Sequence, residues 1–228
     1  MLKFSLENAK RLLFLGAHSD DIEIGCGGTV LELAREFTNL EVRWVVFASD
    51  PSRAAEAAAC AALFLKDVSR TSVMIKDFRD GYFPYLGGAI KDCFEELKRE
   101  ISPDLILTHN REDLHQDHRL VSELTWNTFR DHLIWEYEVP KYDGDFGSPH
   151  LFVHLSESVC RRKLDYVLSS YETQRDKRWF SEDTFLSIMR LRGVESNAPG
   201  RYAEAFYCRK LVLSPHCKSN PETKEPRP

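Results

Sequence analysis

Closely spaced cysteine pairs are absent from this sequence, because the cysteines that occur are scattered. The 228 residues include 6 cysteines, none in a Cys-x-x-Cys pair: Cys26, Cys60, Cys93, Cys160, Cys208 and Cys217. This spacing argues against a thiolate zinc site and against a disulfide framework. Any metal site in this chain is therefore expected to use other side chains, and we infer a reducing, cytoplasmic setting.

The sequence also lacks a long apolar run and a block of basic charge. No stretch approaches the ~20 apolar residues that cross a bilayer. The short apolar segment near the N-terminus follows Glu7 and ends in polar residues, unlike a signal peptide. Lys and Arg number 31 against 36 Asp and Glu, a formal net charge of -5. We therefore expect neither nucleic acid nor membrane as a partner.

Length and composition are those of a folded domain. Hydrophobic residues make up 43% and charged residues 29% of the chain, which is ordinary for a globular protein. We predict a single domain over residues 1–213, with a core at 1–135 and an extension at 136–213. The polar, proline-containing tail at 214–228 is predicted to be disordered.

Apolar runs alternate with segments of helical periodicity up to about residue 135, as in β-α-β units around a parallel sheet. The strands are expected at 11–16, 42–47, 71–75 and 105–108, and the helices at 29–37, 51–65, 86–100 and 116–130. In a sheet of order 3-2-1-4, the first and fourth strands are neighbours at the switch point. The fold class is α/β, with a Rossmann-like, mainly parallel sheet flanked by helices.

After residue 130 this alternation breaks down, and we expect an extension of strands and helices that shapes the substrate cleft. Its strands are predicted at 132–139, 151–155 and 206–213, with one helix from Ser156 to about Tyr171 and another after Ser181.

Polar side chains able to bind a metal follow two strands that we expect to be neighbours. His18, Asp20 and Asp21 follow the first strand, ahead of glycines that open a helix. The segment 115–118, His-Gln-Asp-His, follows the strand at 105–108. Right-handed β-α-β connections would bring both clusters to one crevice.

These clusters predict a metal site of the hydrolytic kind. Zinc in such a site commonly takes three ligands from His and Asp or Glu and leaves a position for water. His18, Asp21 and His118 supply that number, and their single negative charge keeps the metal electrophilic. Asp20 remains free to take a proton from the water. We expect one Zn²⁺ per chain, although another divalent metal also suits these ligands.

Each residue taken alone has a simpler explanation. A single His is more often a surface or core residue, and Asp20 or Asp21 can cap a helix. The glycines at 25–28 can be a degraded dinucleotide loop, although the Gly-x-Gly-x-x-Gly spacing is absent. Two clusters at adjacent strand ends favour the metal site.

The same motifs resemble the LmbE-like, or PIG-L, family of zinc-dependent deacetylases, and the resemblance covers most of residues 11–213. The segments that carry it are Ala17–Asp21, Gly27–Thr29 and His115–His118, with Arg53 and Glu56, Asp80-Gly81, Arg192-Gly193 and Tyr202–Phe206. The resemblance implies removal of an N-acetyl group from a 2-acetamido sugar, similar to N-acetylglucosamine, in a small-molecule conjugate. It also implies that His18, Asp21 and His118 bind zinc, with Asp20 as general base.

The resemblance implies roles for four more residues. His115 would protonate the leaving amine or stabilise the oxyanion, and Asp117 would tune or orient it. Arg53 and Asp80 would bind the substrate. At position 113, where some members of the family have Tyr, this chain has Asp, so no tyrosine-assisted oxyanion hole is expected there.

Two other functions stay open at this point. A related amidase would cleave a larger N-acyl or thiol-conjugate amide with the same metal chemistry. A catalytically silent domain would only bind a sugar or nucleotide, although the intact ligand and base candidates argue against it. The sequence leaves open the acceptor sugar, the resident metal, the roles of Arg192 and Glu204, and whether the chain forms a homo-oligomer.

Overall fold

The apolar runs form one seven-stranded sheet in the computed structural model, which describes residues 5–6 and 9–212. The strands are β1 (Arg11–Gly16), β2 (Glu41–Val46), β3 (Arg70–Ile75), β4 (Leu105–His109), β5 (Leu133–Tyr137), β6 (Leu151–Leu155) and β7 (Tyr202–Tyr207). Their order is β3-β2-β1-β4-β5-β7-β6. The first five strands pair in parallel, whereas β7 runs antiparallel to both β5 and β6. The predicted α/β class and the adjacency of β1 and β4 are confirmed.

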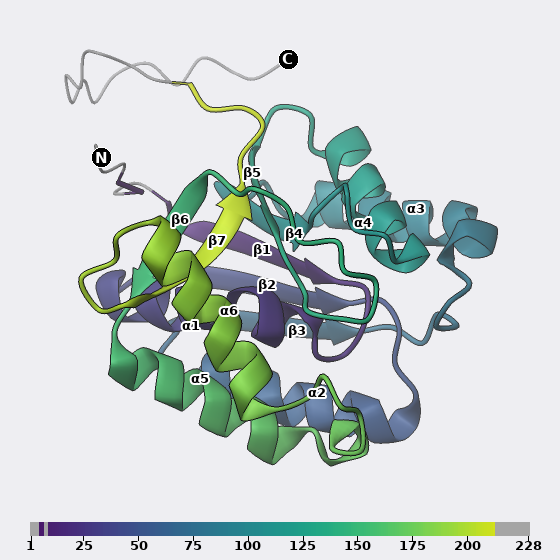
Figure 1. The fold of residues 1–228 in the computed structure, drawn as a ribbon. Coiled ribbons are helices and arrows are strands. Elements are labelled where there is room, and N and C mark those ends of the chain that lie inside the picture. Colours follow the sequence, from purple (N-terminus) through teal and green to yellow (C-terminus); the bar gives the residue numbers. More distant parts are fainter. Residues whose placement is uncertain (1–4, 7–8, 213–228) are drawn as a thin grey trace, which may run out of the picture.

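Helices cover both faces of this sheet (Figure 1). They are α1 (Asp21–Glu36), α2 (Pro51–Phe64), α3 (Phe83–Glu100), α4 (Gln116–Thr128), α5 (Glu157–Ser170), the 3-10 turn η1 (Glu172–Gln174) and α6 (Glu182–Glu195). The side chains of β1 alternate between two cores. Leu12 and Phe14 pack in the cluster that includes α1, α2, α5 and α6, whereas Leu13 and Leu15 pack in the cluster of α3 and α4. Burial on both faces explains why the sequence of β1 is almost entirely apolar.

Helix α1 begins eight residues earlier than predicted, and the glycines at 25–28 lie inside it. The helix is kinked at Cys26, whose φ of -144° is not helical. A Cβ at Gly25 would lie 2.2 Å from the ring of Tyr137, and one at Gly28 would lie 2.6 Å from Leu155. These glycines therefore allow α1 to pass close to the sheet, and the alternative of a dinucleotide loop at 25–28 is not realised.

The C-terminal strand also differs from its prediction. Strand β7 spans Tyr202–Tyr207, not 206–213, because the alternating residues that follow Arg201 pair with both β5 and β6. Leu211 and Val212 are exposed. The predicted boundary after residue 135 falls inside β5, so the extension continues the sheet. Residue 213 and the predicted tail lie outside the described residues.

Among the described residues, no helix is both long enough and apolar enough to cross a membrane.

Candidate metal centre

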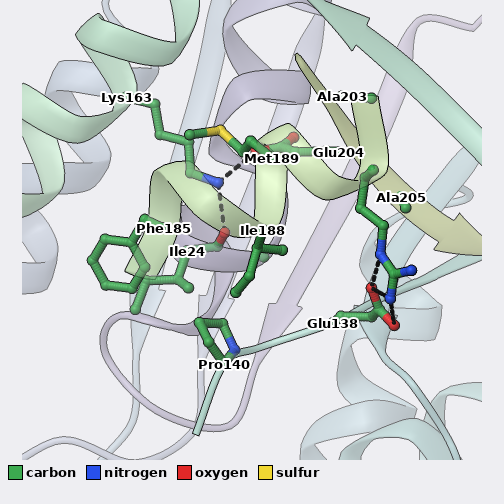
Figure 2. A pocket seen from close by; sticks show the side chains of 12 residues that line it. Ile24, Glu138, Pro140, Lys163, Phe185, Ile188, Met189, Ala203, Glu204 and Ala205 are labelled. Carbon is green, nitrogen blue, oxygen red and sulfur yellow. Dashed lines mark hydrogen bonds and ion pairs between the residues drawn. The ribbon is translucent and has the colours of Figure 1, made fainter. Parts of the chain in front are cut away.

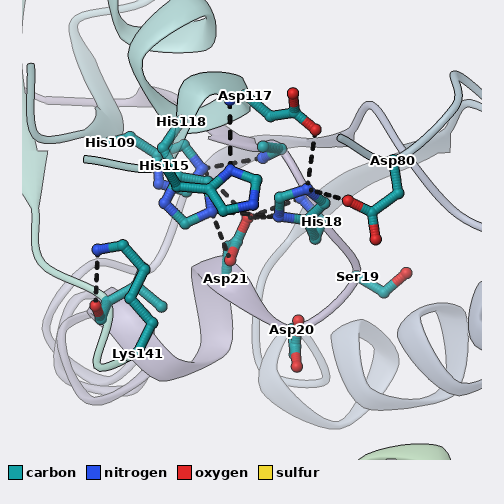
Figure 3. A network of polar contacts seen from close by, with 12 residues as sticks. His18, Ser19, Asp20, Asp21, Asp80, His109, His115, Asp117, His118 and Lys141 are labelled. Atoms are coloured by element: carbon teal, nitrogen blue, oxygen red, sulfur yellow. Dashed lines mark hydrogen bonds and ion pairs between the residues drawn. The ribbon is translucent and has the colours of Figure 1, made fainter. Parts of the chain in front are cut away.

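The centre lies where β1 and β4 end side by side. Along these two parallel strands, Leu13 pairs in register with Ile106 and Phe14 with Leu107, so both strands end at the same edge of the sheet. The loop that leads from β1 into α1 and the loop that leads from β4 into α4 therefore meet at this edge. Figure 3 shows the side chains that these loops bring together.

The three predicted metal ligands converge in this crevice. His18 Nδ1 lies 3.1 Å from His118 Nε2 and 3.3 Å from Asp21 Oδ2, and His118 Nε2 lies 3.4 Å from Asp21 Oδ1. Zinc bonds of ~2.0–2.1 Å in a tetrahedral arrangement separate the donor atoms by about 3.3–3.4 Å. All three side chains are buried. The donor set therefore suits a zinc ion in chemistry, with the two histidines facing different oxygens of the Asp21 carboxylate.

Two of these ligands contact a carboxylate through the ring nitrogen that faces away from the other ligands. Asp113 Oδ2 lies 2.9 Å from His118 Nδ1. Asp117 Oδ2 lies 3.3 Å from His18 Nε2, and Asp80 Oδ1 lies 3.1 Å from the same nitrogen. Carboxylates in this position usually fix the tautomer and the orientation of a metal-binding histidine.

The carboxylate of Asp117 is held mainly by backbone N–H groups. It accepts hydrogen bonds from the backbone N–H groups of Gly81, at 2.6 Å, and Phe83, at 3.1 Å, and it also contacts His18. Only the backbone N–H of Asp117 bonds to the ring of His115. The carboxylate therefore joins His18 to the turn before α3, while its charge acts to raise the pKa of His115 against the effect of burial. Its role toward His115 stays a prediction.

His115 itself lies beside the ligands, as expected from its motif. Its ring centroid is 4.9 Å from that of His18 and 4.7 Å from that of His118. Its Nδ1 accepts a hydrogen bond from the backbone N–H of Asp117 at the start of α4. Burial and the neighbouring His118 lower the pKa of His115.

The sequence interpretation missed His109, the last residue of β4. This side chain is fully buried, and its ring stacks on that of His118 with centroids 3.8 Å apart. The backbone N–H of Ala17 donates to His109 Nε2 at 2.9 Å, which occupies the lone pair on that nitrogen. His109 also belongs to a group with Asp21 and His118 whose donors lie close enough for a metal. Extending the predicted strand by one residue would have placed His109 at the crevice.

Asp20 points away from the histidines, toward α2 (Figure 3). Its Oδ1 lies 2.9 Å from Arg53 Nη2, whereas its Oδ2 is buried and has no hydrogen-bond partner among the described residues. It occupies the N-cap position of α1 but makes no capping hydrogen bond with its side chain. Burial raises the pKa of Asp20, although Arg53 acts in the opposite direction. A capping role thus fails to account for this buried carboxylate.

The two predicted substrate-binding residues differ in access. Arg53 is largely covered and is already paired with Asp20. The side chain of Asp80 is 64% exposed, at the rim of the crevice. Its hydrogen bond with His18 lowers the pKa of Asp80 to about 2. Asp80 therefore remains accessible to a substrate. The guanidinium group of Arg53 is instead engaged in its ion pair with Asp20.

Arg192 and Glu204, whose roles the sequence left open, line a separate pocket between α1, α6 and β7 (Figure 2). Glu204 accepts hydrogen bonds from the backbone N–H groups of Gly28 and Thr29, and its Oε1 lies 2.6 Å from Lys163 Nζ. Arg192 pairs with Glu138 at 2.8 Å. Both residues thus support the fold around the centre.

Comparisons with known proteins identify the family and the fold of this chain. The family model described as PIG-L: GlcNAc-PI de-N-acetylase matches residues 13–129, just over half of the chain. A search of curated proteins gives no significant match.

Several solved structures share the fold at low sequence identity. N,N'-diacetylchitobiose deacetylase from Pyrococcus horikoshii is 22% identical, with a TM-score of 0.68 over 89% of this chain and 84% of that chain. The zinc inhibited form of teicoplanin deacetylase Orf2 is 15% identical, with a TM-score of 0.67 over 87% and 97%. GalB, a 4-carboxy-2-hydroxymuconate hydratase, is 16% identical, with a TM-score of 0.68 over 92% and 100%. At these identities the likeness shows the fold alone.

Proposed function

Because this chain belongs to the PIG-L family, we propose that it is a zinc-dependent hydrolase that removes the N-acetyl group from a 2-acetamido sugar conjugate. The observation that carries this proposal is the convergence of His18, Asp21 and His118 in one buried crevice. Three protein ligands leave a position for water, as in other hydrolytic zinc sites. The proposed substrate is a small-molecule conjugate, and we propose a cytoplasmic location.

The proposed ligands are His18, Asp21 and His118, with one zinc ion per chain. Zinc bound there would supply Lewis acidity and lower the pKa of a bound water toward ~7. The chain contributes the base. Arg53 holds Oδ1 of Asp20, so Oδ2 is the oxygen left to accept a proton from the water. Another divalent metal would meet the same donors.

The leaving amine needs a proton, and His115 is the candidate donor. Its ring lies beside His18 and His118 at the edge of the crevice and is only partly buried. General acid catalysis of this kind typically contributes 10²- to 10⁴-fold in rate. Asp80, exposed at the rim, is placed to accept hydrogen bonds from sugar hydroxyl groups.

The test is a release assay on zinc-loaded protein with a panel of N-acetylglucosamine conjugates and sugar nucleotides. We expect acetate and a free amine in equal amounts. Release of a larger acid from N-acyl or thiol-conjugate amides, without acetate, would instead identify the related amidase. Binding of these compounds with no turnover would identify a silent sugar- or nucleotide-binding domain.

A further inference from the structure

A buried ion cluster lies directly behind the proposed ligand His118. Its centre is Asp113, in the loop between β4 and α4, which is 3% exposed. Oδ2 of Asp113 lies 2.9 Å from His118 Nδ1 and 2.9 Å from Lys141 Nζ. Oδ1 accepts a hydrogen bond from the backbone N–H of His115 at 2.8 Å. One carboxylate thus contacts a proposed ligand, a lysine and the loop that leads into the helix of that ligand.

Lys141 belongs to a segment that is held at both ends. Its ammonium group also pairs with Asp145, whose Oδ2 accepts a hydrogen bond from the backbone N–H of Leu114. Arg192 holds both ends of the segment, because it pairs with Glu138 and donates to the backbone oxygen of Gly147. The segment Glu138–Gly147 is therefore tied to the loop before α4 on one side and to α6 on the other.

The contact with Asp113 determines which nitrogen of His118 carries a proton. A histidine binds metal through an unprotonated nitrogen, and here Nε2 faces His18 and Asp21. A carboxylate accepts but cannot donate when ionised, so Asp113 holds the proton on Nδ1. Lys141 compensates the buried negative charge of Asp113.

We propose that Asp113 is a positioning residue for His118, and that Lys141 connects this pair to the segment Glu138–Gly147. Metal affinity then depends on residues of the extension that do not contact the metal. This inference rests on the proposed metal site.

Asp113→Asn is the central variant. The amide oxygen can still accept the hydrogen bond from the backbone of His115, whereas the amide nitrogen then faces His118 Nδ1 and Lys141. An amide donor at that place moves the histidine proton to Nε2, where it opposes metal binding. Loss of such outer partners typically costs 10- to 100-fold in metal affinity, and we expect a loss in that range.

Lys141→Met tests the connection, because it removes the ammonium group and keeps much of the side-chain volume. We expect a smaller loss of zinc affinity. The double variant should match Asp113→Asn alone, since residues that act through one contact are not additive. Glu112→Gln is the matched control: it removes a charge from the same loop, and the side chain of Glu112 is 82% exposed.

Zinc affinity is measured by competition with a chromophoric chelator, and folding of the metal-free proteins by circular dichroism. If the unaltered protein binds no zinc, the proposed function fails. If it binds zinc and Asp113→Asn binds it equally well, only this inference is overturned. If the double variant loses as much zinc affinity as the two single variants together, the role of Lys141 is refuted. If Asp113→Asn does not fold, unchanged affinity in Lys141→Met overturns the inference.

Discussion

At the scale of single residues, Asp20 and Asp21 are adjacent in sequence but face different partners. Asp21 contacts His18 and His118, whereas Asp20 contacts Arg53. Successive residues at a helix start differ in direction by about 100°. On the proposed function, one short motif would supply both a metal ligand and a separate base.

This difference in partners predicts that the same change, Asp to Asn, has different effects at positions 20 and 21. Asp20→Asn keeps its shape but cannot accept a proton, so it should retain about one zinc and lose roughly 10²- to 10⁴-fold in kcat. Asp21→Asn should lose zinc affinity. Metal content and initial rates are measured on the same preparations. A zinc-loaded Asp20→Asn protein with unaltered kcat would falsify the role of Asp20.

The pairing of Arg53 with Asp20 gives a second prediction. Arg53→Met should lower kcat by roughly 10- to 100-fold, because a hydrogen bond to a charged group contributes about 1.5–3 kcal/mol. Arg53→Lys keeps the charge and should recover part of the rate. Steady-state kinetics separates kcat from KM. A rise in KM alone would assign Arg53 to substrate binding, the role that the sequence resemblance implied.

At the scale of secondary-structure elements, α1 depends on a partner that is distant in sequence. After the kink at Cys26, the backbone N–H groups of Gly28 and Thr29 donate to Glu204, which lies on β7. Glu204 therefore caps the second part of α1. No local pattern near residue 28 shows this cap, because its acceptor lies 176 positions further along the chain.

The cap predicts a large loss of stability when Glu204 is changed. Glu204→Gln leaves the buried ammonium group of Lys163 without a counter-charge, and breaking a buried pair typically costs 3–5 kcal/mol. Adding Lys163→Met should recover part of that loss. Denaturant unfolding of the single and double variants measures both effects. Equal stability of the two would show that the buried charge contributes little.

Near the start of α1, Glu23 and Tyr171 predict a pH dependence of stability. Tyr171 Oη lies close to both the Ser19 carbonyl and Glu23 Oε1, and its one proton can serve only one of them. A protonated Glu23 satisfies all three groups. Burial raises the pKa of Glu23 from 4.5 to about 8, with the hydrogen bond from Tyr171 acting in the opposite direction.

The folded protein then binds more protons than the unfolded chain between pH 4.5 and about 8, so its stability falls as pH rises through that range. Glu23→Gln removes this slope, because the amide can donate to Tyr171 without titrating. Unfolding free energies of the metal-free proteins at several pH values measure the difference. Parallel pH profiles for both proteins would contradict a protonated Glu23.

At the scale of the whole molecule, the sequence predicted those features that depend on local patterns. Buried strands and the motifs at their ends are visible in the order of residues, so β1, β4 and the ligands that follow them could be placed together. Contacts between segments that are distant in the sequence could not be predicted. Lys141 pairs with Asp113, and Glu204 pairs with α1, across separations of tens to hundreds of positions. No local sequence pattern indicates which residues meet over such distances.

The proposed metal would join the same distant segments, which predicts its effect on stability. His18 and Asp21 follow β1, whereas His118 lies 100 positions beyond His18 along the chain. A ligand that binds only the folded state stabilises it by about 2.7 kcal/mol at 100 times its Kd. For a domain of this size, 1 kcal/mol corresponds to about 2–4 °C in Tm, so zinc should raise Tm by roughly 5–11 °C. Thermal unfolding with zinc and after chelation measures the shift. Asp20→Asn should show the same rise and Asp21→Asn almost none; an equal rise in both would mean that zinc binds outside this crevice.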